Sequence, residues 1–281
     1  MVMRFVLGVG GAAVWLSGIL QPIPLAFATR CTRLDPGEAQ VISGYRGTQV
    51  YPDYTLERVD RYTYRAWVDL RFTDAKGLIK ASISKKYESL VRNCFAHVSE
   101  TLIGPGGTSL QIGLWKDAPI ELLELAPPTS DIKINRSWFF RSNSEEWESN
   151  ANCPLIIHET MHLLGLVDEY VEYDRHPTVK RRTLYDCRAF GPTTSVMYRQ
   201  SSAFQATDLN WFSQLLPGQE RESLLYTGQF KAIVEPGCTE TNALYYSCAR
   251  NAYQSSDEAG NCPTMPSECA SPDWVGIGSA K

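Results

Sequence analysis

Residues 152–166 form a short apolar segment that allows few structures other than a buried helix. Pro154 falls in the expected first turn, where its missing amide donor costs nothing. Apolar side chains cover most faces: Leu155, Ile156, Ile157, Met161, Leu163 and Leu164. Gly165 follows them, and glycine can take the left-handed backbone conformation that ends a helix without a steric penalty. We therefore expect a buried helix that ends in a sharp turn at Gly165.

The same helix carries two histidines and a glutamate, in the order His158-Glu159-Thr160-Met161-His162. Residues four apart on a helix are separated by about 400°, so the two imidazoles point the same way, one turn apart, and can share one metal ion. Two neutral imidazoles suit zinc and leave it an open position for water. An adjacent carboxylate can take that water's proton as a general base. The pattern predicts His158 and His162 as ligands of one catalytic zinc ion and Glu159 as the general base.

We expect the third protein ligand at Asp168. In an unbroken helix Asp168 would lie about 15 Å along the axis from His158, far beyond a coordination bond of about 2 Å. The turn at Gly165 is therefore required to bring Asp168 back to the metal. Asp168 can instead cap a following helix, because aspartate is a favoured N-cap residue. The alternative ligands are then Glu169, Glu172 and His176.

Together these residues resemble the metzincin clan of zinc peptidases, whose pattern is HExxHxxGxx, a third ligand and a later methionine-containing turn beneath the metal. Ser195-Val196-Met197-Tyr198 is similar to that turn. The resemblance covers about residues 60–217 and implies an upper lobe of twisted sheet and helices, a horizontal cleft, and a small lower lobe ending in a helix. A glutamate ligand would instead indicate a gluzincin-like site, but those sites draw it from a separate downstream helix and leave Gly165 without a role.

Asp168 departs from the commonest metzincin pattern, which has histidine there, and is similar to the third ligand of snapalysin-like members. Two imidazoles and one carboxylate leave zinc a single formal positive charge, so we expect a weaker Lewis acid than a three-histidine site. Met197 is expected to pack beneath the metal rather than take part in chemistry. The donor to the oxyanion stays open among three tyrosines, Tyr170, Tyr173 and Tyr198.

Upstream of the motif the sequence carries strand and helix patterns in turn. Residues 54–72 alternate polar and apolar side chains, which predicts a half-buried strand. An apolar stripe at helical spacing follows, and a glycine- and proline-rich stop at 104–107 ends it. The stripe consists of Ile83, Tyr87, Leu90, Val91, Cys94, Phe95, Val98 and Leu102. Further strands are predicted at residues 110–115, 120–125 and 132–140. The predicted fold class is α+β, with a twisted mixed sheet.

Downstream of the motif, residues 168–196 look irregular, and a short amphipathic helix is predicted at 208–216. Pro217-Gly218 ends that helix. Beyond it the hydrophobic periodicity fades while four cysteines fall close together, which indicates a disulfide-stapled extension. We therefore divide the chain into a signal peptide (1–28), a metzincin-like metallopeptidase domain (29–218) and a cysteine-rich C-terminal extension (219–281).

The first residues predict export. Arg4 precedes an apolar run from Phe5 to Leu20, and Ala26-Phe27-Ala28 is typical of a signal-peptide cleavage site. The run is shorter than the roughly 20 apolar residues a spanning helix needs, so a stable membrane anchor is not expected. The formal net charge of −4, with one notable basic run at 180–182, argues against nucleic acid as a partner. We expect a secreted or periplasmic protein.

All eight cysteines lie beyond the predicted cleavage point, and an even number in an exported chain indicates disulfides. Eight cysteines allow 105 connectivities, so their pairing stays open. The segment around Cys31 faintly resembles the matrixin cysteine switch, in which a propeptide thiolate occupies the zinc. Because no propeptide precedes Cys31 and the cysteine count is even, we expect a disulfide there.

These observations favour a zinc metalloendopeptidase that hydrolyses a protein or peptide substrate by Glu159-assisted attack of water. The competing hypothesis is a secreted, disulfide-rich binding or adhesion protein with a structural or vestigial zinc site, which the cysteine-rich extension favours. A vestigial site can lose its base without losing its metal, whereas this chain retains both histidines, Glu159 and the turn residue. The sequence leaves the cleavage preference and the oligomeric state open.

Overall fold

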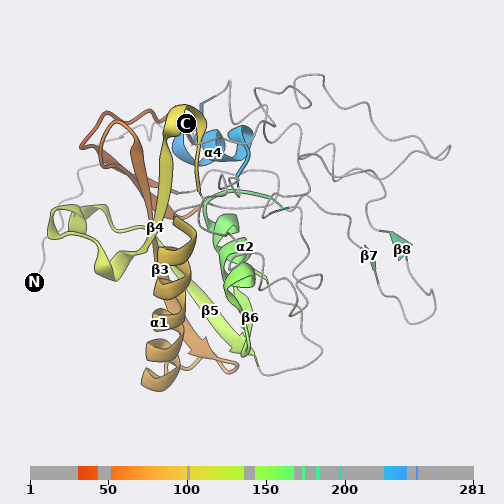
Figure 1. The fold of residues 1–281 in the computed structure, drawn as a ribbon. Coiled ribbons are helices and arrows are strands. Elements are labelled where there is room, and N and C mark those ends of the chain that lie inside the picture. The colour runs from red at the N-terminus through yellow and green to blue at the C-terminus, as the bar shows by residue number, and fades with distance from the viewer. Residues whose placement is uncertain are drawn as a thin grey trace, which may run out of the picture.

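The computed structural model describes residues 31–43, 52–99, 102–135, 143–167 and 225–238, together with 173–174, 182–183, 197 and 245. These residues include a six-stranded mixed sheet against which helices pack (Figure 1). The predicted α+β class with a mixed sheet is confirmed. The strands of this sheet and the three α-helices that the structure describes all contribute side chains to one hydrophobic cluster.

Strand β3 (Thr63–Asp74) is the centre of the sheet. It runs antiparallel to β2 (Tyr54–Arg58), which pairs antiparallel with β1 (Ala39–Ile42). The first half of β3 pairs in parallel with β4 (Ser109–Leu114), and its second half with β5 (Thr129–Asn135). Strand β6 (Glu146–Glu148) runs parallel to β5. Because β3 has neighbours along its length and packing on both faces, three successive side chains are buried: Ala66, Trp67 and Val68.

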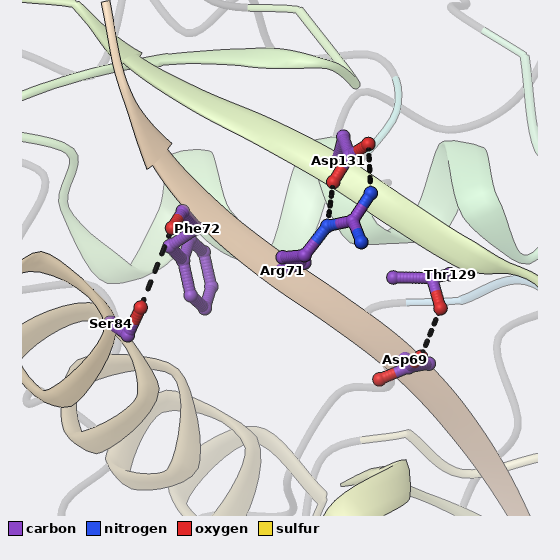
Figure 2. A network of polar contacts seen from close by, with 6 residues as sticks. All are labelled: Asp69, Arg71, Phe72, Ser84, Thr129 and Asp131. Carbon is purple, nitrogen blue, oxygen red and sulfur yellow. Dashed lines mark hydrogen bonds and ion pairs between the residues drawn. The ribbon is translucent and has the colours of Figure 1, made fainter. Parts of the chain in front are cut away.

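Polar pairs between β3 and β5 help to fix the register of these two strands (Figure 2). Arg71 and Asp131 are directly opposite, and the guanidinium Nη2 donates to Asp131 Oδ2 over 2.6 Å. Thr129 Oγ1 donates to Asp69 Oδ2 over 2.5 Å in the pair two positions away along the strands. Both pairs are exposed, so their main effect is on register rather than on stability.

Helix α1 (Ala81–Val98) packs on this sheet through much of the predicted stripe. Its Tyr87 ring stacks on Phe72 of β3, with 5.7 Å between the ring centroids. Ser84 Oγ also donates to the Phe72 carbonyl over 3.4 Å (Figure 2). The helix ends at Val98, before the end of the stripe, and Ser99 Oγ donates to the Phe95 carbonyl over 2.7 Å at its last turn. Leu102 is still fully buried after the helix has ended.

Helix α2 (Cys153–Leu163) lies beside α1 and contains the two histidines (Figure 1). A disulfide joins Cys94 of α1 to Cys153 in the first turn of α2. Tyr87 donates from its hydroxyl to the Ser149 carbonyl over 2.8 Å, just before α2. These two links to α1 fix the position at which α2 begins.

Helix α4 (Thr227–Val234) packs in the same core, although it follows residue 218, the predicted end of the peptidase domain. The Tyr54 hydroxyl donates to the Ile233 carbonyl over 2.7 Å, and the Phe230 ring meets Tyr64 edge-on. A disulfide between Cys31 and Cys238 closes the same end of the molecule. Residues 225–238 and 245, assigned by sequence to the extension, thus pack with the sheet. The rest of 219–281 lies outside the described residues.

The strand predicted at 120–125 is wrong, because Ile120–Leu125 forms a 3-10 helix. Its apolar spacing fits a strand or a helix equally well, and only burial decides between them. Ile120 is 75% exposed and Leu123 57% exposed, so the segment lies on the surface. Pro119 precedes it, and the Leu122 N–H donates to the Pro119 carbonyl over 3.0 Å, which closes a tight turn. Two other 3-10 turns span Pro105–Gly107 and Trp115–Asp117.

The pattern over residues 54–72 was read as one strand, and the structure contains two. Asp60 makes the break, since its Oδ1 accepts from the backbone N–H groups of Tyr62 (2.7 Å) and Thr63 (2.9 Å). Strands β1 and β6 were not predicted, and neither were the two-residue strands β7 (Tyr173–Asp174) and β8 (Arg182–Thr183). The strands at 110–115 and 132–140 correspond to β4 and β5, with residues 136–140 outside the described part.

The four described cysteines all form disulfides, which confirms the expectation for Cys31. Cys187, Cys248, Cys262 and Cys269 lie outside the described residues, as do residues 1–28 and the helix predicted at 208–216. In the part of the chain that is described, no helix is long and apolar enough to cross a membrane.

Candidate metal centre

Helix α2 places its polar residues in an otherwise apolar environment. Asn152 is the N-cap, and its Oδ1 accepts from the Leu155 N–H over 3.1 Å. Pro154 lies in the first turn, as predicted. Both His158 and Glu159 are almost fully buried, at 2% and 3% exposure. A buried polar cluster of this kind is costly unless its members interact with one another or with a ligand.

His158 and His162 lie one turn apart on the same side of α2. Their ring centroids are 5.0 Å apart, and the ring planes are nearly perpendicular at 88°. His162 Nδ1 lies 2.8 Å from the Leu166 carbonyl oxygen, and only a protonated Nδ1 can donate to a carbonyl. In the neutral ring this leaves the lone pair on Nε2. His162 is therefore oriented to bind a metal through Nε2.

The Glu159 carboxylate lies beside this lone pair. Its Oε2 is 4.0 Å from His162 Nε2, and the side chain is 4% exposed. With a neutral imidazole the contact is not an ion pair. The carboxylate is instead positioned next to the atom that would bind the metal, where it can reach a water molecule on the same side.

The end of α2 forms the turn that the sequence predicted at Gly165. Gly165 has φ of 92°, in the region that glycine adopts without strain. Its N–H donates to the His162 carbonyl over 2.9 Å, and the Leu166 N–H donates to the Met161 carbonyl over 3.0 Å. These two bonds define a Schellman motif, which satisfies the last carbonyls of the helix. The chain then leaves the helix axis instead of continuing along it.

Two residues distant in sequence contact this helix end, and neither was predicted. The Val167 N–H donates to the Tyr245 hydroxyl over 3.1 Å. The backbone N–H of Asp53 donates to the Leu163 carbonyl over 2.9 Å. The Asp53 side chain is half-buried, and this desolvation raises the pKa of its carboxyl from 3.8 to about 6. No local sequence signal marks either residue, because both contacts depend on tertiary structure.

The structure thus brings together His158, Glu159 and His162, and it describes the chain up to Val167. Asp168 and the alternative ligands Glu169, Glu172 and His176 lie outside the described residues, as do Tyr170 and Tyr198. Met197 is fully buried in the same hydrophobic cluster as Met161 of α2. Among the described residues, no group of three or more histidine, cysteine, aspartate or glutamate side chains is close enough to hold a metal.

The described donors fit zinc as part of a ligand set. Two imidazoles on adjacent turns, one with its Nδ1 hydrogen-bonded to a carbonyl, are the donors that zinc takes in catalytic sites. They would supply two of the three protein ligands that a catalytic zinc site usually has.

Comparison with protein-family models, curated proteins and solved structures finds no match to this chain. The site therefore has to be interpreted from its own chemistry.

Proposed function

We propose that this chain is an exported zinc metalloendopeptidase with a metzincin-like fold. The observation that carries the proposal is the arrangement on α2, in which His162 Nδ1 lies at the Leu166 carbonyl oxygen and the Glu159 carboxylate lies 4.0 Å from His162 Nε2. His158, His162 and Asp168 would hold one zinc ion. When bound, zinc supplies a Lewis acid that polarises the peptide carbonyl and makes water more acidic.

Glu159 acts as the general base in this proposal. Its carboxylate takes a proton from the attacking water and passes it to the leaving amine, so that the peptide C–N bond breaks and the carboxylate is regenerated. Burial of Glu159 strengthens its electrostatic interactions, since little water competes for the carboxylate. The two histidines do not exchange protons. Their role is to bind and orient.

Two further observations support the metzincin-like arrangement and the export. The order of strand, helix, strands and helix agrees with the upper lobe that the resemblance implies, and Gly165 turns the chain at the position where a third ligand has to return. The two disulfides are compatible with an extracellular location.

The decisive experiment compares the purified mature chain with its Glu159→Gln variant on a mixed peptide library, with zinc content measured by mass spectrometry. We expect both proteins to hold one zinc ion. The variant should lose several orders of magnitude in turnover, because the base lies outside the coordination shell. Equal turnover would refute the mechanism. Zinc without any hydrolysis in the parent would favour the binding or adhesion protein.

A second set of variants tests the third ligand. Asp168→Ala should weaken zinc binding severely and abolish proteolysis, whereas Glu169→Ala and His176→Ala should keep zinc near one per chain. Asp168→Asn separates liganding from capping, because asparagine caps a helix as well as aspartate but is a poorer zinc ligand. If Asp168→Asn binds zinc like the parent and Glu169→Ala or His176→Ala does not, then another HExxH architecture replaces the metzincin one.

A further inference from the structure

One peptide group connects a histidine of the candidate site to a residue far along the chain. The carbonyl of Leu166 and the N–H of Val167 belong to the same peptide unit. Its oxygen lies 2.8 Å from His162 Nδ1, and its nitrogen donates to the Tyr245 hydroxyl over 3.1 Å. The Val167–Tyr245 bond spans 78 positions of sequence.

Both the oxygen and the N–H of this peptide group make hydrogen bonds, and the residues around it are buried. The described chain contains no cis peptide bond, so the C=O and N–H point in opposite directions from one rigid plane. Leu166, Val167 and Tyr245 are buried, with exposures of 0%, 1% and 0%. Water therefore cannot replace either hydrogen bond without a change in structure. Donation from the N–H also polarises the carbonyl and makes it a better acceptor for His162.

The orientation of the peptide plane determines how His162 presents its ring. The carbonyl fixes the proton on Nδ1 and leaves Nε2 as the metal-binding atom. Gly165, with φ of 92°, imposes little steric restriction of its own just before this peptide group. The bond to Tyr245 adds a restraint on this peptide group beyond the two backbone hydrogen bonds of the Schellman turn.

We propose that Tyr245 is a positioning residue for the metal centre, acting on His162 through the Leu166–Val167 peptide group. This inference rests on the proposed zinc site. Tyr245 does not contact the metal. Its hydroxyl accepts from the Val167 N–H and so holds the peptide plane, and the carbonyl of that plane fixes the tautomer of the His162 imidazole.

Tyr245 is fully buried in the hydrophobic core cluster. The Cys31–Cys238 disulfide anchors the chain shortly before it, and the Tyr54 hydroxyl holds α4 through the Ile233 carbonyl over 2.7 Å. Residues beyond 218 therefore contribute to the geometry of the candidate site as well as to the core.

The test compares Tyr245→Phe with Tyr54→Phe, a matched control in the full mature chain. Both tyrosines are fully buried, and each hydroxyl bonds to a backbone group. Only the Tyr245 bond leads to the His162 ring. Zinc dissociation constants are measured by competition with a chromophoric chelator, and the guanidinium midpoint is measured on metal-free protein. We expect a ten- to hundredfold weaker zinc affinity for Tyr245→Phe, and less than a twofold change for Tyr54→Phe.

Cobalt substitution adds a spectroscopic readout, since a displaced imidazole changes the visible bands of Co²⁺ in Tyr245→Phe but not in Tyr54→Phe. Zinc affinity of Tyr245→Phe within twofold of the parent overturns the inference, as do equal losses in both variants. Failure of the parent to bind zinc overturns the proposed function as well. If Tyr245→Phe does not fold, hydrogen exchange of the parent decides: fast exchange of the Val167 amide in the folded protein would refute the contact.

Discussion

Removal of the Cys94–Cys153 disulfide tests how firmly α2 is attached to the rest of the fold. The bridge closes a loop with a sequence separation of 59. The loop-closure relation for the unfolded chain gives a stabilisation of about 4 kcal/mol for a loop of this length. Replacing both cysteines by alanine should lower the free energy of unfolding by about that amount. The guanidinium midpoint should fall by roughly 1 M, given the slopes typical of chains of this size.

The assay is equilibrium unfolding followed by tryptophan fluorescence, because Trp147 of β6 is fully buried, with its ring 5.6 Å from that of Phe72. The Cys31–Cys238 bridge provides the comparison, since its sequence separation is 207. Stabilisation grows only with the logarithm of loop length, so its removal should cost only about 1 kcal/mol more. A loss below about 1 kcal/mol for the Cys94–Cys153 pair would refute the loop-closure reasoning. So would a cost several times larger for the longer loop.

Three further substitutions follow from the structure. Asp53→Asn should raise the free energy of unfolding at pH 7 by about 1 kcal/mol, a value discounted for partial exposure. Burial raises the pKa of the Asp53 carboxyl from its usual 3.8 to about 6, so the stability of the parent should fall as pH rises through that range. The variant should not show this pH dependence. Gly113→Ala should cost about 1–3 kcal/mol, because a Cβ there would lie 2.5 Å from the Trp67 ring, whose Nε1 is held by Glu57. Thermal unfolding unchanged from the parent would contradict this. Gly165→Ala should cost about 1–2 kcal/mol through its positive φ, and Gly165→Asn less, as measured by guanidinium titration.

The motif helix and its end could be predicted because their signals are local. Pro154 and the apolar run define the helix, His158 and His162 share a face through the helical repeat alone, and a glycine at 165 indicates the turn. The stripe of α1 is local in the same sense, and only its end differs from the structure, because α1 ends at Val98, before the last residue of the predicted stripe.

The remaining features depend on contacts between distant residues. Tyr245 lies in a stretch without hydrophobic periodicity, and nothing near it in sequence indicates a bond to Val167. The pairing of Cys94 with Cys153 is one of many that eight cysteines allow. Short strands such as β1 and β6 have too few residues to show alternation, so they become recognisable only when a partner strand is present. Ile120–Leu125 is likewise exposed because no other segment that the structure describes packs over Ile120 and Leu123, which the local sequence does not indicate.

The attachment of α4 to the first strands has a consequence for the order in which the chain folds. Tyr54 of β2 bonds to Ile233, Thr32 donates its N–H to the Pro236 carbonyl over 2.9 Å, and Cys31 pairs with Cys238. During synthesis the N-terminal strands are made long before these partners exist. The parallel pairing of β3 with β4 and β5 adds further non-local contacts, which form slowly. The contacts with residues 233–238 therefore cannot form until these residues have left the ribosome, long after the strands that they hold have been made.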